Sequence, residues 1–435
     1  MTHIVHIVVL PVARDTMPYG LLETAKKVLY KWVRFLDPCV VTNIDEWNEL
    51  PNRAKDADVI MIFSGYLDNV EPLRRAKKPI ILWSWTREEV LSMWSWENLT
   101  WLRENGINVP VFVSLDDLRL YFKALVAYKS LRGSRILLLM VKRPGFIWGF
   151  DPVLKLMKDK LGITVSIRDR SLLRKAFYEV QYEEVKNMIE KVPYIHREIS
   201  EQDLINSIRM YLALKKIINF EKLDGIGIDC LAEPFKTDKG LPVHPCLAFS
   251  LLEDNGIACG CEGDPLSIVT MLLLMRFLNE PCFMTNIYPL SLAPAVAEHL
   301  GIPTHNFNPK RTVLLCHCAY LGVVPPSMTS KFELVMKWDK IHKGGVMIDA
   351  EVPSRYVTMV KLSPTFSTIQ VILGKLLEVA RFSALHCRAA GVVEVKDSVK
   401  IAEKLFSHHV VVLLGDKRKE LKVLADAGNL KYEEL

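Results

Sequence analysis

Residues 246–290 read CLAFSLLEDNGIACGCEGDPLSIVTMLLLMRFLNEPCFMTNIYPL, and the order of their apolar runs and turns decides the fold class. Cys246–Leu252 is apolar enough to form the end of a buried helix, and a polar turn follows it. Ile257–Cys261 is short, small and apolar, as expected of a strand buried on both faces. Asp264 and Pro265 predict a new helix, because aspartate caps free N–H groups and proline fits the first helical position. The stretch therefore predicts helix, strand, helix and strand, the alternation of an α/β fold.

Glu262 stands between the predicted strand and the helix that follows it. In open α/β sheets, ligands bind at the carboxyl ends of the strands. A carboxylate at this position is either a solvated loop acid or a metal ligand and general base, and the local pattern fits both interpretations. The neighbouring Asp264 needs no functional explanation, since N-capping already accounts for it.

The run GIACGCEGDPLSIVTMLLL at residues 256–274 resembles a segment of the L-fucose isomerase and L-arabinose isomerase superfamily. In that family the corresponding acid binds a divalent metal and takes part in proton transfer, which implies both roles for Glu262. The segment PCFMTNIYPL is similar to the one that carries a second metal-binding acid, and it places Asn286 there. The segment SHHVVVLLGD resembles the one with a histidine ligand, and it places His409 there. The similarity covers roughly residues 240–435 and extends to the first half of the chain only by architecture.

This resemblance implies an aldose–ketose isomerase that acts on a pentose, a 6-deoxyhexose or a related sugar through a metal-stabilised enediolate. It implies Glu262 and Asn286 as catalytic residues, a metal set of Glu262, Asn286 and His409, and a homo-oligomer, a trimer or hexamer. Oxygen ligands with one histidine suit Mn²⁺ or another hard divalent cation. The small-molecule partner is a sugar.

Asn286 departs from the family pattern, because an amide oxygen ligates a metal but cannot act as a base. Asp229 and Asp416 are candidates by position to supply the missing charge. An alternative function is a non-catalytic carbohydrate-binding or regulatory protein of the same fold. A third is a different isomerase or lyase step on a sugar acid or sugar phosphate.

Other residues extend the candidate site. His317, in LLCHCAY, resembles a family histidine near the metal, and its alternative is a strand histidine with a satisfied hydrogen bond. For His409, which follows His408, the alternative to a ligand role is an ordinary solvated histidine between a helix and a strand. Arg143 and Trp148, in KRPGFIWGFD, follow a predicted strand at the ligand edge, where an aromatic ring stacks on sugar C–H bonds and a guanidinium reaches hydroxyls. An ordinary strand-to-helix loop also explains these two residues and is the slightly favoured interpretation.

Sulfur ligands offer a competing site. Cys259 and Cys261 are two apart, as are Cys316 and Cys318 around His317, and residues two apart in a strand share a face. Structural zinc sites more often use C-x₂₋₄-C spacing, and cysteine in apolar runs is usually free. Zinc is therefore the less favoured interpretation.

Composition excludes several classes of protein. The chain has 435 residues, half of them hydrophobic and 24% charged, with a net charge of +6. No long basic run is interleaved with aromatic residues, so nucleic acid is not an expected partner. The N-terminus lacks a signal peptide pattern and the longest apolar run is too short for a membrane span, so we expect a cytoplasmic protein without membrane contact. Nine cysteines without secretory context argue against a disulfide framework.

The predicted architecture is two doubly wound parallel-sheet α/β domains, residues 1–132 and 133–304, followed by a smaller β-rich domain, residues 305–435. Neither a G-x-G-x-x-G after the first strand nor a G-x-x-x-x-G-K-[ST] motif is present, which removes two routes to nucleotide binding. Expected strands in the first domain are Ile4–Val12, Cys39–Thr42, Asp58–Gly65, Pro79–Trp85 and Val109–Ser114, and expected helices include Tyr19–Arg34 and Leu115–Arg132. Expected strands in the last domain are Val313–Tyr320, Phe332–Trp338, Gly345–Val352, Tyr356–Leu362, Val392–Val395 and His409–Leu414.

Overall fold

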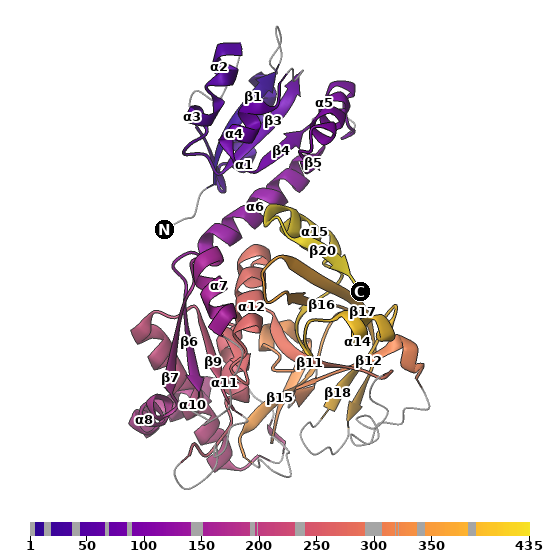
Figure 1. Cartoon of the computed structure of the whole chain (residues 1–435). Coiled ribbons are helices and arrows are strands. Elements are labelled where there is room, and N and C mark those ends of the chain that lie inside the picture. The colour runs from indigo at the N-terminus through magenta and orange to yellow at the C-terminus, as the bar shows by residue number, and fades with distance from the viewer. Residues whose placement is uncertain are drawn as a thin grey trace. The chain divides into compact units, whose positions relative to one another are not determined.

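The computed structural model describes residues 5–12, 19–36, 44–65, 69–84, 89–140, 151–191, 196–197, 199–230, 240–291, 307–317, 319–320, 322–336, 344–381 and 389–435. The chain divides into two compact units, Met1–Ser130 with Asp426–Asn429 and Leu131–Ala425 with Leu430–Leu435. The fold is mixed α/β: each unit has a parallel sheet, and the second unit adds a β-rich antiparallel sheet (Figure 1). The doubly wound arrangement and a separate domain from residue 305 stay predictions.

The first unit is built on a parallel sheet in the order β2-β1-β3-β4-β5. Its strands are β1 Val5–Val12, β2 Val33–Phe35, β3 Val59–Gly65, β4 Ile80–Trp83 and β5 Val111–Phe112. The helices are α1 Tyr19–Leu29, α2 Ile44–Asn48, α3 Leu50–Arg53, α4 Glu71–Ala76, α5 Met93–Glu104 and α6 Leu115–Leu131. Ile60, Ile62 and Leu82 are fully buried in its core, as expected of parallel strands with both faces covered.

The helix predicted over Tyr19–Arg34 is wrong in its last part. Helix α1 ends at Leu29, and Val33–Phe35 instead forms β2, with Val33 opposite Val5. The Trp32 N–H donates to the Leu29 carbonyl in the turn between them. Three residues are too few to show a strand period, so the apolar Val33 extends the helical pattern of the sequence by accident. The strand predicted at Cys39–Thr42 lies outside the described residues.

The second unit begins with a parallel sheet in the order β10-β9-β6-β7. Its strands are β6 Arg135–Met140, β7 Thr164–Asp169, β9 Gly225–Ile228 and β10 Ala258–Cys261, and its helices are α7 Asp151–Leu161, α8 Ser171–Glu179, α9 Tyr182–Lys191, α10 Glu201–Glu221 and α11 Cys246–Glu253. Glycines let the next helix approach this sheet closely. A Cβ atom added at Gly260 would lie 2.6 Å from Cγ1 of Ile268, and one added at Gly227 would lie 3.0 Å from its Cδ1. Larger residues at these positions would push the helix, and the loop before it, away from the sheet.

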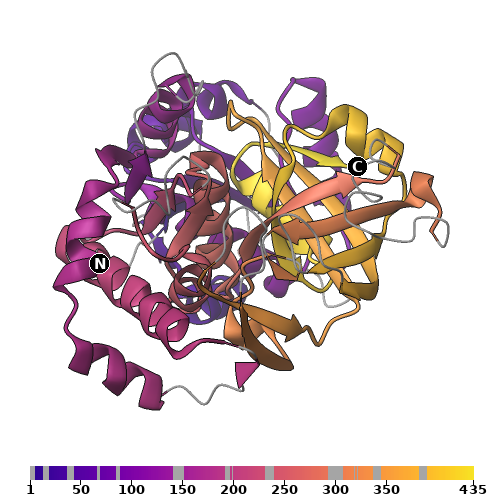
Figure 2. The same cartoon turned by 90° about the horizontal axis from the view of Figure 1, so that it is seen from below.

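The rest of the second unit is mainly antiparallel. Strands β11 Phe283–Pro289, β12 Thr312–His317, β13 Ala319–Tyr320, β16 Tyr356–Leu362, β17 Thr368–Arg381, β18 Ala389–Glu394, β19 His409–Leu414 and β20 Lys431–Glu434 form one sheet. The ladder runs β11-β19-β16-β17-β18-β12, and β12 pairs again with β11, so these strands close into a barrel-like ring, which can be followed among the orange and yellow strands of Figure 2.

Smaller elements complete this unit. Strands β8 His196–Arg197, β14 Lys331–Met336 and β15 Val346–Glu351 make a separate three-stranded sheet. The short helices are η2 Pro309–Arg311, η3 Pro326–Met328 and α14 Ser398–Lys404, and the last helix is α15 Arg418–Ala427.

Helix α12, Pro265–Leu278, lies against the parallel sheet and the antiparallel ring of the second unit. Every residue except Arg276 is buried, as expected of a helix that is apolar on all sides. It contacts β9 and β10 of the parallel sheet and β16 and β19 of the antiparallel ring. The N-terminus of α12 is therefore the place where residues from the parallel sheet and from the antiparallel ring meet. No helix among the described residues has the length and apolar run needed to cross a bilayer.

Candidate metal centre

A left-handed turn presents Glu262 at the end of β10. Glu262 has φ 56° and Gly263 has φ 70°. The positive φ costs a glutamate about 1 kcal/mol or more, and such strain is most often retained at functional sites. Asp264 then caps α12, with Oδ1 accepting from the backbone N–H groups of Leu266 and Ser267 at 2.9 and 3.2 Å. The predicted cap and the proline at the helix start are confirmed.

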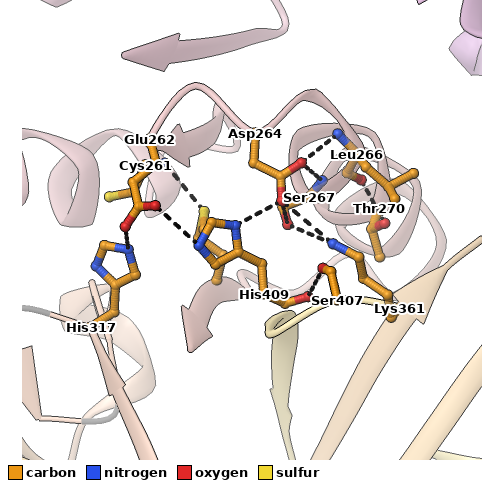
Figure 3. Close-up of polar contacts among 11 residues, drawn as sticks. Cys261, Glu262, Asp264, Leu266, Ser267, Thr270, His317, Lys361, Ser407 and His409 are labelled. Carbon is orange, nitrogen blue, oxygen red and sulfur yellow. Dashed lines mark hydrogen bonds and ion pairs between the residues drawn. The ribbon is translucent and has the colours of Figure 1, made fainter. Parts of the chain in front are cut away.

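The carboxylate of Glu262 faces two histidines (Figure 3). Nε2 of His317, at the end of β12, lies 3.3 Å from Oε1, and Nε2 of His409, at the start of β19, lies 3.6 Å from Oε2. The two imidazole rings are 6.0 Å apart between centroids. The His317 and His409 side chains are only 3% and 9% exposed, whereas Glu262 is 20% exposed. These three predicted site residues therefore converge, with the acid as the member most open to solvent.

His408 adds a further ligand atom that the sequence interpretation did not assign. Atoms of Glu262, His408 and His409 suited to metal coordination lie within 4.8 Å of one another. The His408 and His409 rings are 4.3 Å apart between centroids. Burial, followed by the charge of His409, lowers the pKa of His408 below its ordinary value of 6.5, so its neutral, metal-binding form is favoured near neutral pH. The position of His408 next to His409 in the sequence is the signal from which this additional ligand could have been predicted.

Asp264 does more than cap its helix. Its second oxygen, Oδ2, lies 3.0 Å from Nδ1 of His409 and accepts from the Ser267 hydroxyl at 2.7 Å and from Nζ of Lys361 at 3.4 Å. Burial raises the pKa of the Asp264 carboxyl, but the charge of Lys361 and the hydrogen bond with His409 outweigh it, so this pKa lies well below its ordinary value. The interpretation of Asp264 as a cap alone is therefore incomplete.

Asn286 lies beside His409 in the β11–β19 ladder, where the two residues are register partners. Its side-chain N–H group donates to the Tyr288 hydroxyl at 3.0 Å. Its amide oxygen is buried and has no hydrogen-bond partner among the described residues, and the same holds for Nε2 of His409. Direct ligation by Asn286 stays a prediction, but it has an acceptor atom free for a cation.

Of the remaining candidates, Asp229 lies beside the turn that carries Glu262, since a Cβ atom added at Gly263 would be 3.7 Å from the Asp229 backbone nitrogen. Asp229 directly follows β9 and is 1% exposed, and its backbone carbonyl accepts from Nη1 of Arg170 at 3.0 Å. The carboxylate of Asp416 is held by Arg418 at 2.7 Å on the surface, so it does not supply the charge that Asn286 lacks. Arg143 and Trp148 lie outside the described residues, and their sugar-binding role stays a prediction.

The cysteines form no cation site within the part of the chain that the structure describes. Cys259, Cys261 and Cys316 are buried and belong to no disulfide. Within that part, the group of side chains close enough to share a cation is the one made by Glu262, His408 and His409. Cys318 lies outside the described residues.

A scan against protein-family models finds no match for this chain, and a search of the curated proteins finds none either. The geometry of the site therefore carries the functional interpretation.

Proposed function

We propose that this chain is a divalent-metal-dependent aldose–ketose isomerase, of the kind suggested by the resemblance of residues 256–274 to the L-fucose and L-arabinose isomerases. The observation that supports this most is the convergence of Glu262, His317 and His409. These residues come from three separate segments, and their side chains meet at the carboxyl edge of a parallel sheet. Ligand sites occur at such edges.

The residues present fit a divalent cation. Glu262 offers a carboxylate, His408 and His409 offer imidazole nitrogens, and Nε2 of His409 has no hydrogen-bond partner among the described residues. Carboxylate oxygens suit Mn²⁺ and imidazole nitrogens suit Fe²⁺, Zn²⁺ and other transition metals, so this mixed set can hold Mn²⁺ or another first-row divalent cation. When bound, the cation would polarise two oxygens of an open-chain sugar and stabilise the negative charge that develops during proton transfer.

The protein's own part is proton transfer. In the aldose-to-ketose direction a proton leaves C2 and one enters C1, while a hydroxyl proton passes from O2 to O1, so no oxidant is needed. Glu262 is the acid available for the carbon-to-carbon transfer, because its carboxylate is more exposed than the side chains of His317 and His409. His317, 3.3 Å from Oε1, holds that carboxylate in place. Asn286, an amide, orients a ligand and moves no proton.

The test uses the full-length protein, stripped with EDTA and reloaded with Mn²⁺. It is incubated with a panel of pentoses and 6-deoxyhexoses in D₂O. The expected result is formation of a ketose that carries some deuterium at C1, and its loss in a Glu262→Gln variant. Glu89→Gln is the matched control, because Glu89 is an exposed glutamate that also has a positive φ, 51°. Failure of every aldose to react would contradict the proposal. The mass of the native protein in sedimentation tests the trimer or hexamer that the resemblance implies.

A non-catalytic sugar-binding protein is the second candidate, and Asn286 favours it. An amide in place of an acid removes one negative charge from the metal set and weakens the binding of hard cations. Sugar binding without Mn²⁺ binding and without turnover would support this alternative. Tight Mn²⁺ binding by the native protein would count against it.

A further inference from the structure

The contacts of Asp264 divide between its two oxygens. Oδ1 accepts from the backbone N–H groups of Leu266 and Ser267. Oδ2 lies within reach of three side chains, the Ser267 hydroxyl at 2.7 Å, Nδ1 of His409 at 3.0 Å and Nζ of Lys361 at 3.4 Å. An ionised carboxylate only accepts hydrogen bonds, so each of these neighbours has to donate to it.

This requirement decides which nitrogen of His409 carries the proton. A neutral imidazole has one N–H group and one lone pair. If Nδ1 donates to Asp264, the lone pair belongs to Nε2, the atom that faces Glu262 at 3.6 Å. In metal sites, a hydrogen bond from the far nitrogen of a ligating histidine to a carboxylate fixes the ring and its tautomer.

Lys361 keeps Asp264 in its accepting form. This lysine is on β16, its side chain is 1% exposed, and its hydrogen-bond partners are Asp264 and Ser267. A buried ammonium group without a counter-charge is strongly unfavourable, so Lys361 and the ionised Asp264 stabilise each other. Strand β16, which carries Lys361, pairs with β19, which carries His409. The lysine and the histidine are therefore held on adjacent strands.

We propose that Asp264 is a positioning residue that, together with Lys361, holds His409 as the Nδ1–H tautomer with its Nε2 lone pair directed at the Glu262 carboxylate. Its purpose, presentation of a lone pair to a divalent cation, rests on the proposed function. The tautomer itself is a property of the metal-free protein and does not depend on that function.

The deciding variant is Asp264→Asn. Asparagine is as good an N-cap as aspartate, so its oxygen can keep the bonds to Leu266 and Ser267. Its NH₂ group then replaces Oδ2 and donates to Nδ1 of His409, which forces the proton onto Nε2. The matched control is Asp397→Asn. Asp397 caps α14 through the same pair of bonds, with Oδ1 accepting from the N–H groups of Val399 and Lys400 at 3.0 and 2.9 Å. The hydrogen bonds described for Asp397 include none from a histidine.

The experiment reads the His409 ring by long-range ¹H–¹⁵N NMR on ¹⁵N-histidine-labelled, metal-free protein at pH 8, with assignment by a His409→Gln variant. We expect Nδ1–H in the native protein and in Asp397→Asn, and Nε2–H in Asp264→Asn. An Nε2–H or doubly protonated ring in the native protein overturns the proposal, whether or not Asp264→Asn folds. An unchanged tautomer in a folded Asp264→Asn variant also overturns it.

Mn²⁺ titration of the same proteins separates the two proposals. Asp264→Asn is expected to weaken Mn²⁺ binding about 10–100-fold, the usual effect of losing a residue that orients a ligand, and Asp397→Asn to leave it unchanged. The expected tautomers without any Mn²⁺ binding by the native protein would uphold the positioning role and contradict the metal-dependent function. Tight Mn²⁺ binding by a native protein whose His409 is Nε2–H would contradict the positioning role and leave the metal-dependent function standing.

Discussion

His409 Nε2 lies 3.6 Å from Oε2 of Glu262, although Glu262 ends a strand of the parallel sheet and His409 starts a strand of the antiparallel ring. The candidate metal centre lies at the start of helix α12, which contacts strands of both sheets. We expect His409→Gln to weaken Mn²⁺ binding about 100-fold or more, since loss of a direct ligand should exceed the 10–100-fold cost of losing a residue that orients one. Calorimetric titration measures this, and Mn²⁺ affinity equal to that of the native protein would exclude His409 as a ligand.

The left-handed backbone of Glu262 predicts a stability effect separate from its chemistry. Glycine adopts a positive φ without the penalty of a Cβ atom. We therefore expect Glu262→Gly to be more stable than Glu262→Ala by about 1 kcal/mol, measured by urea unfolding. At Lys175, exposed within helix α8 of the same unit, the order should reverse, because glycine in a helix interior costs about 1 kcal/mol relative to alanine. The same order at both positions would contradict the assignment of strain to Glu262.

Local chemistry explains which parts of this site could be predicted from sequence. The end of the strand at Cys261 and the cap at Asp264 follow from neighbouring residues, and both are confirmed. The strand His409–Leu414 is confirmed to the residue, because it is a short apolar run with polar residues on both sides. The bounds of Tyr356–Leu362 are also confirmed, but its alternation suggested a half-exposed strand, and every residue after Tyr356 is buried.

Pairing across the chain could not be predicted in this way. The contact of Lys361 with Asp264 depends on strand order in the ring, and no local pattern encodes it. Strand β17, Thr368–Arg381, was not predicted, since its mixture of leucine, lysine and glutamate also suits a helix. A register shift between Leu376 and Glu378 further disturbs its alternation.

Asn286 gives a direct test of the departure from the family pattern. Its register partner is His409, and its amide oxygen is without a hydrogen-bond partner among the described residues. Asn286→Asp places a carboxylate in nearly the same volume. If Asn286 faces the cation, we expect Mn²⁺ to bind about tenfold or more tightly, a gain of about 1.4 kcal/mol from the added charge. Weaker or unchanged binding in calorimetry would show that this position does not contribute to the metal set.

The buried Glu253 makes the stability of the protein depend on pH, and this dependence can be tested. This last residue of α11 is 1% exposed, and both carboxyl oxygens lack a hydrogen-bond partner among the described residues. Burial, and after it the charge of Asp254, raises the pKa of Glu253 well above the ordinary value of 4.5, while His317 acts in the opposite direction. The folded protein therefore keeps a proton on Glu253 over a pH range in which the unfolded chain has lost it.

By proton linkage, the stability that Glu253 contributes is fully present below pH 4.5 and is lost as the pH rises through its folded-state pKa. Glu253→Gln has a neutral group of the same shape and no such proton. Its free energy of unfolding, relative to the native protein, should therefore rise steadily with pH above 4.5 and be constant below it, as urea unfolding from pH 4 to pH 8 would measure. Glu184→Gln should show a small effect of opposite sign, because hydrogen bonding from Lys216 lowers the pKa of the exposed Glu184. A pH-independent difference for Glu253→Gln would mean that the Glu253 carboxyl is ionised in the folded protein and has a partner there.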